Sequence, residues 1–203
     1  MKWIYASAFV GILIIVLFFF FFSKTAYTPL RPHTDQPFRG NADAAVIVEE
    51  FSDFQCPACK SAEPGIQDLL SRYGDKIKFI YKDFPLSSLH PNAQRAAEAA
   101  QCVFDQGNEF FWKYHDILFD NQNKLYSANL KEYASTIGFN TTAFNQCFDS
   151  GVMSQRVSLD SEEGINRGVS ATPTFFVNGK KSVGANMQAV ENLIKTELAK
   201  GSI

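Results

Sequence analysis

The chain has one long apolar segment near its N-terminus, and the shorter apolar runs that follow predict the elements of a folded domain. Residues 3–22 carry no charge and are almost all apolar, with Lys2 before them and Lys24 after them. About 20 residues at roughly 1.5 Å each match a hydrocarbon core of about 30 Å. The pattern predicts a transmembrane anchor over 1–24. The alternative is a cleaved signal peptide, whose apolar region is typically shorter, about 7–15 residues, and ends in a small-x-small site.

The next stretch, 25–41, is rich in proline and poor in apolar residues, so it predicts a linker.

The domain is expected over 42–203. Its first strand is expected at Ala45–Phe51, which is apolar up to Glu49, as is typical of a strand buried on both faces. A helix is expected at Pro57–Tyr73 and a second strand at Ile77–Tyr81. A strand–helix–strand unit predicts two parallel strands joined by a right-handed crossover.

From about residue 85 to 168 the pattern becomes helical, which predicts an all-helical insert. Its helices are expected at 93–103, 108–119, 130–137, 141–148 and 152–167.

Strands return after the insert. Thr174–Val177 and Lys180–Val183 flank Asn178-Gly179, and an Asn-Gly pair between apolar runs is a strong signal of a β-hairpin. Asn186 is expected to cap the last helix.

Composition narrows the classes of function. The formal net charge is −2 and the isoelectric point is about 5.9, which argues against nucleic acid as a partner. The four cysteines are Cys56, Cys59, Cys102 and Cys147. An even number is compatible with two disulfides and an oxidising compartment. Because only one cysteine pair is closely spaced, the pattern does not predict a zinc site, which needs four ligands in close pairs.

The segment Cys56-Pro57-Ala58-Cys59 lies where the first strand hands over to the first helix. The first turn of a helix has unpaired N–H groups and a partial positive charge, which favour a thiolate. Pro57 suits the first helical position, where its missing N–H costs nothing. The placement predicts a reversible redox disulfide, with Cys56 attacking and a more shielded Cys59 resolving. Glu49 and Glu50 are adjacent, so one carboxylate should face inward near the cysteines.

The order strand–helix–strand, helical insert, strand–strand–helix resembles the DsbA-like branch of the thioredoxin superfamily. The matching segments are VEEFSDFQCPAC (48–59), HPNA (90–93) and GVSATPTFFVNG (168–179). The resemblance implies an α/β thioredoxin fold (β-α-β … β-β-α) with a helical insert, here preceded by one N-terminal transmembrane helix.

The resemblance also implies roles for individual residues. Thr172-Pro173 matches the cis-proline dipeptide that holds the client backbone, although only about 5–6% of X–Pro bonds in folded proteins are cis. Glu50 matches a buried acid that moves protons for Cys59, the alternative being a solvated glutamate. Cys102 and Cys147 match a structural disulfide, the alternative being buried free thiols.

Ala58 departs from the most oxidising members of the branch, which carry a histidine between the two cysteines. A histidine cation stabilises the thiolate and thus the reduced form, which makes the disulfide a stronger oxidant. We therefore expect a reduction potential between those of DsbA and thioredoxin.

Together these features predict a membrane-anchored, extracytoplasmic oxidoreductase, in the periplasm or at the cell surface. It is expected to act as a monomer and to donate its disulfide to reduced client proteins, without a metal or organic cofactor. The resemblance implies recycling by a quinone-linked membrane protein of the DsbB or vitamin-K-epoxide-reductase type. Two alternatives stay open: a reductase or isomerase of the same fold, and a non-catalytic module that binds a peptide or metal.

Overall fold

The computed structural model describes residues 35–201. The anchor, the alternative signal peptide and most of the predicted linker lie outside the described residues. Within 35–201, none of the helices has the length and apolar character needed to cross a bilayer.

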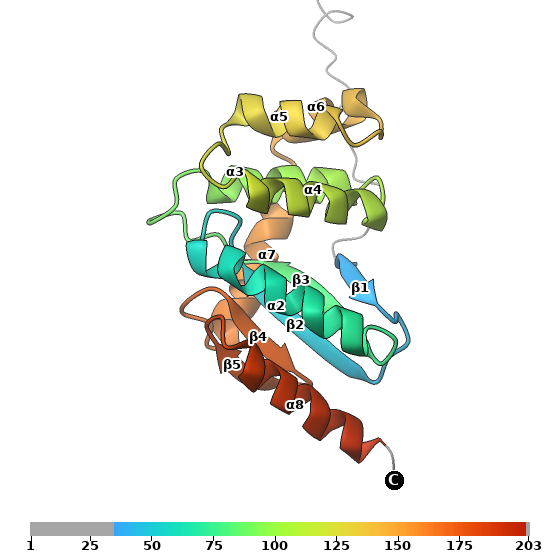
Figure 1. Ribbon diagram of the computed structural model, residues 1–203. Helices are drawn as coiled ribbons and strands as arrows, with labels where there is room; N and C mark the ends of the chain where they lie inside the picture. Colours follow the sequence, from blue (N-terminus) through green and yellow to red (C-terminus); the bar gives the residue numbers. More distant parts are fainter. Residues whose placement is uncertain (1–34, 202–203) are drawn as a thin grey trace, which may run out of the picture.

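A five-stranded sheet forms the centre of the domain (Figure 1). Its strands lie in the order β1-β3-β2-β4-β5. Strands β2 and β3 are parallel, as the strand–helix–strand pattern predicts, and the other neighbours are antiparallel. The bounds are β1 Phe38–Gly40, β2 Val46–Ser52, β3 Ile77–Asp83, β4 Thr174–Val177 and β5 Lys180–Val183.

Three residues of the predicted linker form the edge strand β1. Phe38 lies opposite Ile80 and Gly40 opposite Lys78 in an antiparallel ladder with β3. The carbonyl oxygen of Phe38 also accepts a hydrogen bond of 2.7 Å from Trp112 Nε1. The linker prediction is therefore wrong for residues 38–40, and the domain begins before residue 42. A three-residue edge strand held by its backbone is too short to produce a recognisable alternation of apolar and polar residues.

Helices cover both faces of the sheet. Helix α2 (Pro57–Tyr73) and helix α8 (Met187–Lys200) lie against one face (Figure 1). They approach closely at Gly65, where an added Cβ would lie 2.4 Å from Met187 Cγ. On the other face, a small apolar cluster includes Phe51 and Phe84. Helix α7 packs there through Gly164, where an added Cβ would lie 2.7 Å from the Phe84 ring.

All five helices predicted for the insert are present, with ends shifted by a few residues. They are α3 Ala93–Phe104, α4 Asn108–Asp120, α5 Ser127–Ser135, α6 Thr141–Ser150 and α7 Ser154–Asn166. Helices α5 and α6 stack on α3 and α4 at the end of the molecule farther from β4 and β5 (Figure 1). A disulfide joins Cys102 on α3 to Cys147 on α6, with the Cα atoms 5.8 Å apart. The alternative of two free thiols does not hold.

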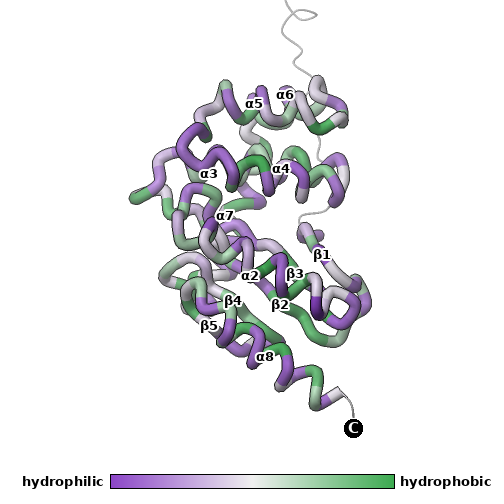
Figure 2. The backbone as a smooth tube through the Cα atoms, viewed as in Figure 1, coloured by the Kyte–Doolittle hydropathy of each residue, from purple (hydrophilic) through white to green (hydrophobic). Residues whose placement is uncertain are grey.

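The C-terminal hairpin and helix agree with the sequence pattern. Asn178 and Gly179 have φ angles of 44° and 81°, as a two-residue turn with both central residues left-handed requires. The side chain of Asn186 accepts a hydrogen bond from the Ala189 N–H and so caps α8. Along α8 hydrophobic and hydrophilic positions alternate, whereas β2 is mostly hydrophobic (Figure 2). This difference reflects one buried stripe on α8 and a central position for β2.

Candidate active site

The two cysteines of CPAC lie at the start of α2, directly after the turn that follows β2. Cys56 is the N-cap residue and Pro57 occupies the first helical position. Both thiols are free. Cys56 retains 7% of its surface, whereas Cys59 is fully buried. Their relative exposure agrees with an attacking Cys56 and a shielded Cys59.

The pKa of the Cys56 thiol lies well below its usual value. A hydrogen bond from the Cys59 thiol is the largest cause, and it lowers the pKa of Cys56 to about 5 although burial opposes the shift. Thr172 and the backbone N–H groups of Ala58 and Cys59 lower the pKa further. At neutral pH Cys56 is therefore a thiolate, which is the reactive form of the residue.

Cys59 behaves in the opposite way. Burial raises its pKa well above the usual value, and the hydrogen bond to Cys56 and the charge of Glu50 add to the shift. Cys59 therefore holds its proton at neutral pH. It needs a proton acceptor nearby before it can act as a nucleophile.

The Thr172-Pro173 peptide bond is cis, the geometry that the resemblance implied. Cys56 Sγ lies 3.5 Å from the carbonyl oxygen of Thr172, and it donates a hydrogen bond to this oxygen when the thiol is protonated. Although 116 positions separate Cys56 from Thr172, the fold places the cis-proline segment against the redox pair.

Glu50 is the inward-facing carboxylate of the adjacent pair. Glu50 is fully buried, and neither of its carboxyl oxygens has a hydrogen-bond partner among the described residues. Burial, and then the negative charge of Glu63, raise the pKa of Glu50 well above the usual value. Glu49 faces the other side of the sheet and forms an ion pair of 2.7 Å with Arg167. The solvated alternative for Glu50 therefore fails, and a carboxyl that holds a proton lies close to Cys59.

Asp53 lies within the matching segment 48–59, and the structure gives this residue a role in the site. Its side chain is fully buried. Its Oδ2 accepts hydrogen bonds of 2.7 Å from His90 Nδ1 and 2.8 Å from Leu86 N, and its Oδ1 accepts one of 2.7 Å from Gln55 N. The carboxylate thus fastens the turn before Cys56 to the loop after β3. An Asp two residues before the N–H that donates to it is a turn signal, but the partners in the other loop depend on the tertiary fold.

Gln122, from the loop after α4, is a contact that sequence reasoning missed. Its Nε2 donates hydrogen bonds of 2.8 Å to Phe54 O and 2.9 Å to Cys56 O. The helical insert therefore supports the backbone of the redox loop. No local pattern marks Gln122, because its partners lie more than 60 positions earlier in the chain.

One group of side chains in the region 35–201 has the composition of a metal site. Glu63, His115 and Asp116 bring potential ligand atoms within 4.8 Å of one another. Arg39 already forms an ion pair of 2.8 Å with Asp116. This group lies between α2 and α4 and does not include the CPAC cysteines.

A family model described as thioredoxin matches residues 33–196. The chain therefore belongs to the thioredoxin family. Within it, the chain is DsbA-like and is a protein disulfide oxidoreductase, as its similarity to solved structures indicates. The structure of BdbD from Bacillus subtilis is 25% identical, with a TM-score of 0.75 over 86% of this chain and 98% of that one. The thiol-disulfide exchange protein alpha-DsbA2 from Wolbachia pipientis is 23% identical, with a TM-score of 0.71 over 79% and 86% of the two chains.

The chain also resembles part of several curated proteins. It is 36% identical over 172 residues to a Na(+)/H(+) antiporter NhaA of Salinispora tropica, covering 84% of this chain and 26% of that protein. An NhaA antiporter of Herminiimonas arsenicoxydans is 32% identical over 157 residues, or 77% of this chain and 24% of that protein. The chain thus spans about a quarter of the length of these relatives. Their name describes the whole proteins.

Proposed function

We propose that this protein is an extracytoplasmic oxidase of client thiols, which donates the Cys56–Cys59 disulfide. The observation that carries the proposal is that the pKa values of the two cysteines are shifted in opposite directions. Cys56 has a pKa of about 5, and Cys59 is buried with a raised pKa. A low thiol pKa stabilises the reduced form and makes that sulfur a good leaving group, and both effects favour transfer of the disulfide to a client.

The reaction consists of two exchange steps. A client thiolate attacks Cys56 Sγ of the disulfide; the client–Cys56 bond forms, the Cys56–Cys59 bond breaks, and Cys59 Sγ leaves with the electron pair. Glu50 supplies the proton that the buried Cys59 requires. A second client thiolate then attacks the client sulfur of the mixed disulfide, and Cys56 leaves as a thiolate. The client has been oxidised to a disulfide, and CPAC has been reduced to a dithiol.

The segment around Thr172-Pro173 would hold the client strand. Its support is the position of the Thr172 carbonyl, 3.5 Å from Cys56 Sγ. A client backbone paired beside this segment would bring its cysteine to the exposed side of Cys56. Residues 57 and 58 are also exposed, so they would face the client.

The location and the recycling partner are further parts of the proposal. The Cys102–Cys147 disulfide suits an oxidising compartment, and residues 1–24 would anchor the domain to the membrane facing that compartment. A quinone-linked membrane protein of the DsbB or vitamin-K-epoxide-reductase type would accept the electrons from reduced CPAC. Resistance of the full chain to alkaline carbonate extraction tests the anchor, and full release into the supernatant would contradict it.

The reduction potential of the Cys56–Cys59 pair in the full chain tests the direction of the reaction. We expect a value above about −200 mV from a glutathione titration followed by thiol alkylation. A value near that of thioredoxin, about −270 mV, would instead assign a reductase. The Cys56→Ser variant is the control and should show no couple. Absence of a reversible couple in the unsubstituted chain would favour a binding module that does not catalyse thiol exchange.

A further inference from the structure

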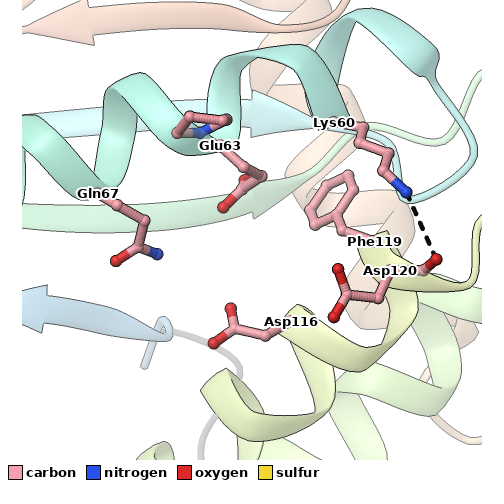
Figure 3. Close-up of a pocket in the computed structure, with 7 residues that line it drawn as sticks. Lys60, Glu63, Gln67, Asp116, Phe119 and Asp120 are labelled. Atoms are coloured by element: carbon pink, nitrogen blue, oxygen red, sulfur yellow. Dashed lines mark hydrogen bonds between the residues drawn. The ribbon is translucent and has the colours of Figure 1, made fainter.

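A cavity of about 410 Å³ lies between α2 and α4. In Figure 3, Glu63 points into this space from α2 and Asp116 points into it from α4. The side chain of Asp116 is 49% exposed and that of Glu63 is 16% exposed. The cavity therefore leads from bulk solvent to a carboxyl group that is largely enclosed by the protein.

Glu63, which lines this cavity, also faces a buried histidine, His115. Glu63 Oε1 lies 3.7 Å from His115 Nε2, and neither atom has a hydrogen-bond partner among the described residues. The His115 side chain is only 1% exposed. Its ring packs against aromatic neighbours, including Phe54 and Phe119, with ring centroids 5.7 Å and 4.8 Å away.

The other nitrogen of His115 fixes the role of Nε2. Nδ1 lies 2.9 Å from Asp116 Oδ1. Burial alone would raise the pKa of Asp116, but the hydrogen bond from His115 and the charge of Arg39 outweigh it, so the pKa is lowered. Because the ionised Asp116 can only accept, Nδ1 donates to it. Nε2 then faces Glu63 as an acceptor when it carries no proton and as a donor when it carries one. Two acceptors that face each other in a buried place need a proton or another cation between them.

A proton fits this position better than a metal ion. Arg39 Nη2 contacts both carboxylate oxygens of Asp116, at 3.1 Å and 2.8 Å, so Asp116 is already neutralised. Glu63 and His115 are then the two side chains of the group left to bind, fewer than the three protein ligands that catalytic zinc sites use. Burial also raises the pKa of Glu63, although the charge of His115 opposes the shift.

The pair is connected to the redox site through Glu50. Glu63 follows Cys59 by four positions on α2, so both side chains lie on the same face of the helix. Glu50 lies on β2, and a negative charge on Glu63 raises the pKa of Glu50. Glu50 is paired in register with Tyr81 of β3, whose ring centroid lies 5.2 Å from that of His115. Titratable groups thus extend from Cys59 through Glu50 and Glu63 to His115 and the cavity.

We propose that Glu63 and His115 form a proton path between Glu50 and the solvent in this cavity. The inference rests on the proposed redox function and adds two positioning residues to it. When the CPAC disulfide opens, Cys59 Sγ takes the electron pair and a proton from Glu50. Glu50 is then reprotonated from Glu63, and Glu63 from His115 or from water in the cavity. On reoxidation the same proton leaves in the reverse order. The CPAC disulfide is the oxidant when client thiols react, and the recycling partner, or oxidised glutathione in the test, is the oxidant when CPAC is reoxidised.

The charged and titratable groups that face the pair come from every element packed against it. They are Arg39 on β1, Glu50 on β2, Tyr81 on β3, Cys59 and Lys60 on α2, and Asp116 and Asp120 on α4. A pH profile alone therefore does not isolate Glu63, and the test needs a second readout.

The test follows the reduced full chain as oxidised glutathione reoxidises it between pH 5 and 8. Cys56 first forms a mixed disulfide with glutathione, and Cys59 must then lose its proton to resolve it. We expect Glu63→Gln and His115→Asn to slow the resolving step at least about tenfold at pH 7, within the range of general acid–base effects. Formation of the mixed disulfide and the Cys56 pKa, read from thiolate absorbance at 240 nm, should not change. Glu63→Asp keeps an acid and should retain most of the rate.

Small buffers distinguish a proton path from a structural role. Imidazole or acetate that enters the cavity should restore the rate of Glu63→Gln in proportion to its concentration. The matched control is Glu162→Gln, which removes the same charge at an exposed position on α7. The proton path would be contradicted if the resolving rates of both variants stayed within twofold of the rate of the unsubstituted chain. It would also be contradicted if no buffer restored the lost rate, or if the control lost as much. A resolving rate that falls when EDTA removes bound metal would contradict it as well.

The same titration separates this inference from the proposed function. A chain without a reversible glutathione couple would fail as an oxidoreductase. A chain with a normal couple and normal resolving rates in both variants would keep its function and lose only the proton path. The melting temperature of each variant verifies folding, and His115→Asn retains a side-chain amide in place of Nδ1 to bond Asp116.

Discussion

At the scale of single residues, two cysteines three positions apart have opposite acid–base properties. Cys56 lies at the start of α2 among hydrogen-bond donors, whereas Cys59 is buried near Glu50. The helix start is visible in the sequence, so the reactive member of the pair could be predicted. The choice between Glu49 and Glu50 could not be made from residues alone, because alternation shows that they face opposite sides of the sheet but not which side holds the site.

Residue 58 should set the oxidising strength of the pair. Ala58 is exposed beside Cys56, and a histidine cation there would stabilise the thiolate. We expect Ala58→His to lower the Cys56 pKa below about 5 and to raise the reduction potential by about 30 mV or more, since 30 mV corresponds to a tenfold change in the equilibrium constant. Glutathione titration measures it. Ala58→Gln is the neutral control of similar size, and an unchanged potential in Ala58→His would contradict the argument.

Glu50 should make stability depend on pH. Its pKa in the folded state is raised above the ordinary value of 4.5, mainly by burial. The folded protein then binds this proton more tightly than the unfolded chain does, so the free energy of unfolding falls as pH rises above that value. We expect Glu50→Gln to have little effect on stability at pH 4 and to stabilise the protein increasingly towards pH 8. Urea unfolding at both pH values measures it. A gain as large at pH 4 as at pH 8, or one shared by Glu162→Gln, would show another cause.

At the scale of elements, the sequence patterns identified most helices and strands of the domain. Pro57–Tyr73, Thr174–Val177 and Lys180–Val183 have the bounds that the patterns predict. Each carries strong local signals, such as a proline at the start of a helix or an Asn-Gly turn. The sequence predicts a linker where the structure has the strand Phe38–Gly40, because the pairing of this strand with β3 depends on backbone hydrogen bonds and on α4.

The turn before Cys56 should depend on Asp53 for its stability. This buried carboxylate accepts hydrogen bonds from the β3–α3 loop and from its own turn. Asp53→Ala leaves those donors without their acceptor, and we expect a loss of about 2–4 kcal/mol in the free energy of unfolding. Asp43→Ala, at an exposed position, is the control and should stay within about 0.5 kcal/mol. Urea denaturation at pH 7 compares the two variants. Equal stabilities would show that Asp53 does not stabilise the turn before Cys56.

At the scale of the whole molecule, the active site is assembled from distant segments. The start of α2, the loop after β3, the loop after α4 and the cis-proline segment meet at one end of β2. The insert therefore supports the redox loop and does not act as a separate module. Its disulfide lies elsewhere, between α3 and α6.

Removal of that disulfide should separate stability from redox chemistry. Cys102 and Cys147 are 45 positions apart, and closure of such a loop contributes up to about 4 kcal/mol in the chain-entropy model. We expect Cys102→Ala/Cys147→Ala to lose about 2–4 kcal/mol of unfolding free energy. The potential of the Cys56–Cys59 pair should not change. Denaturation and glutathione titration of the same sample measure both, and a shifted potential would mean that the insert disulfide is coupled to the active site.

The sequence by itself determined the order of the domain's elements from β2 onward, the redox motif and the family resemblance, because these depend on local periodicity, turn chemistry and short motifs. The tertiary structure decided which carboxylate is buried, how Asp53 and Gln122 hold the redox loop, and that Glu63 meets His115. The physical reason is that burial and electrostatic coupling depend on distances between residues remote in the chain. Glu63 and His115 lie on different helices 52 positions apart, and packing of α4 against α2 brings them within 3.7 Å.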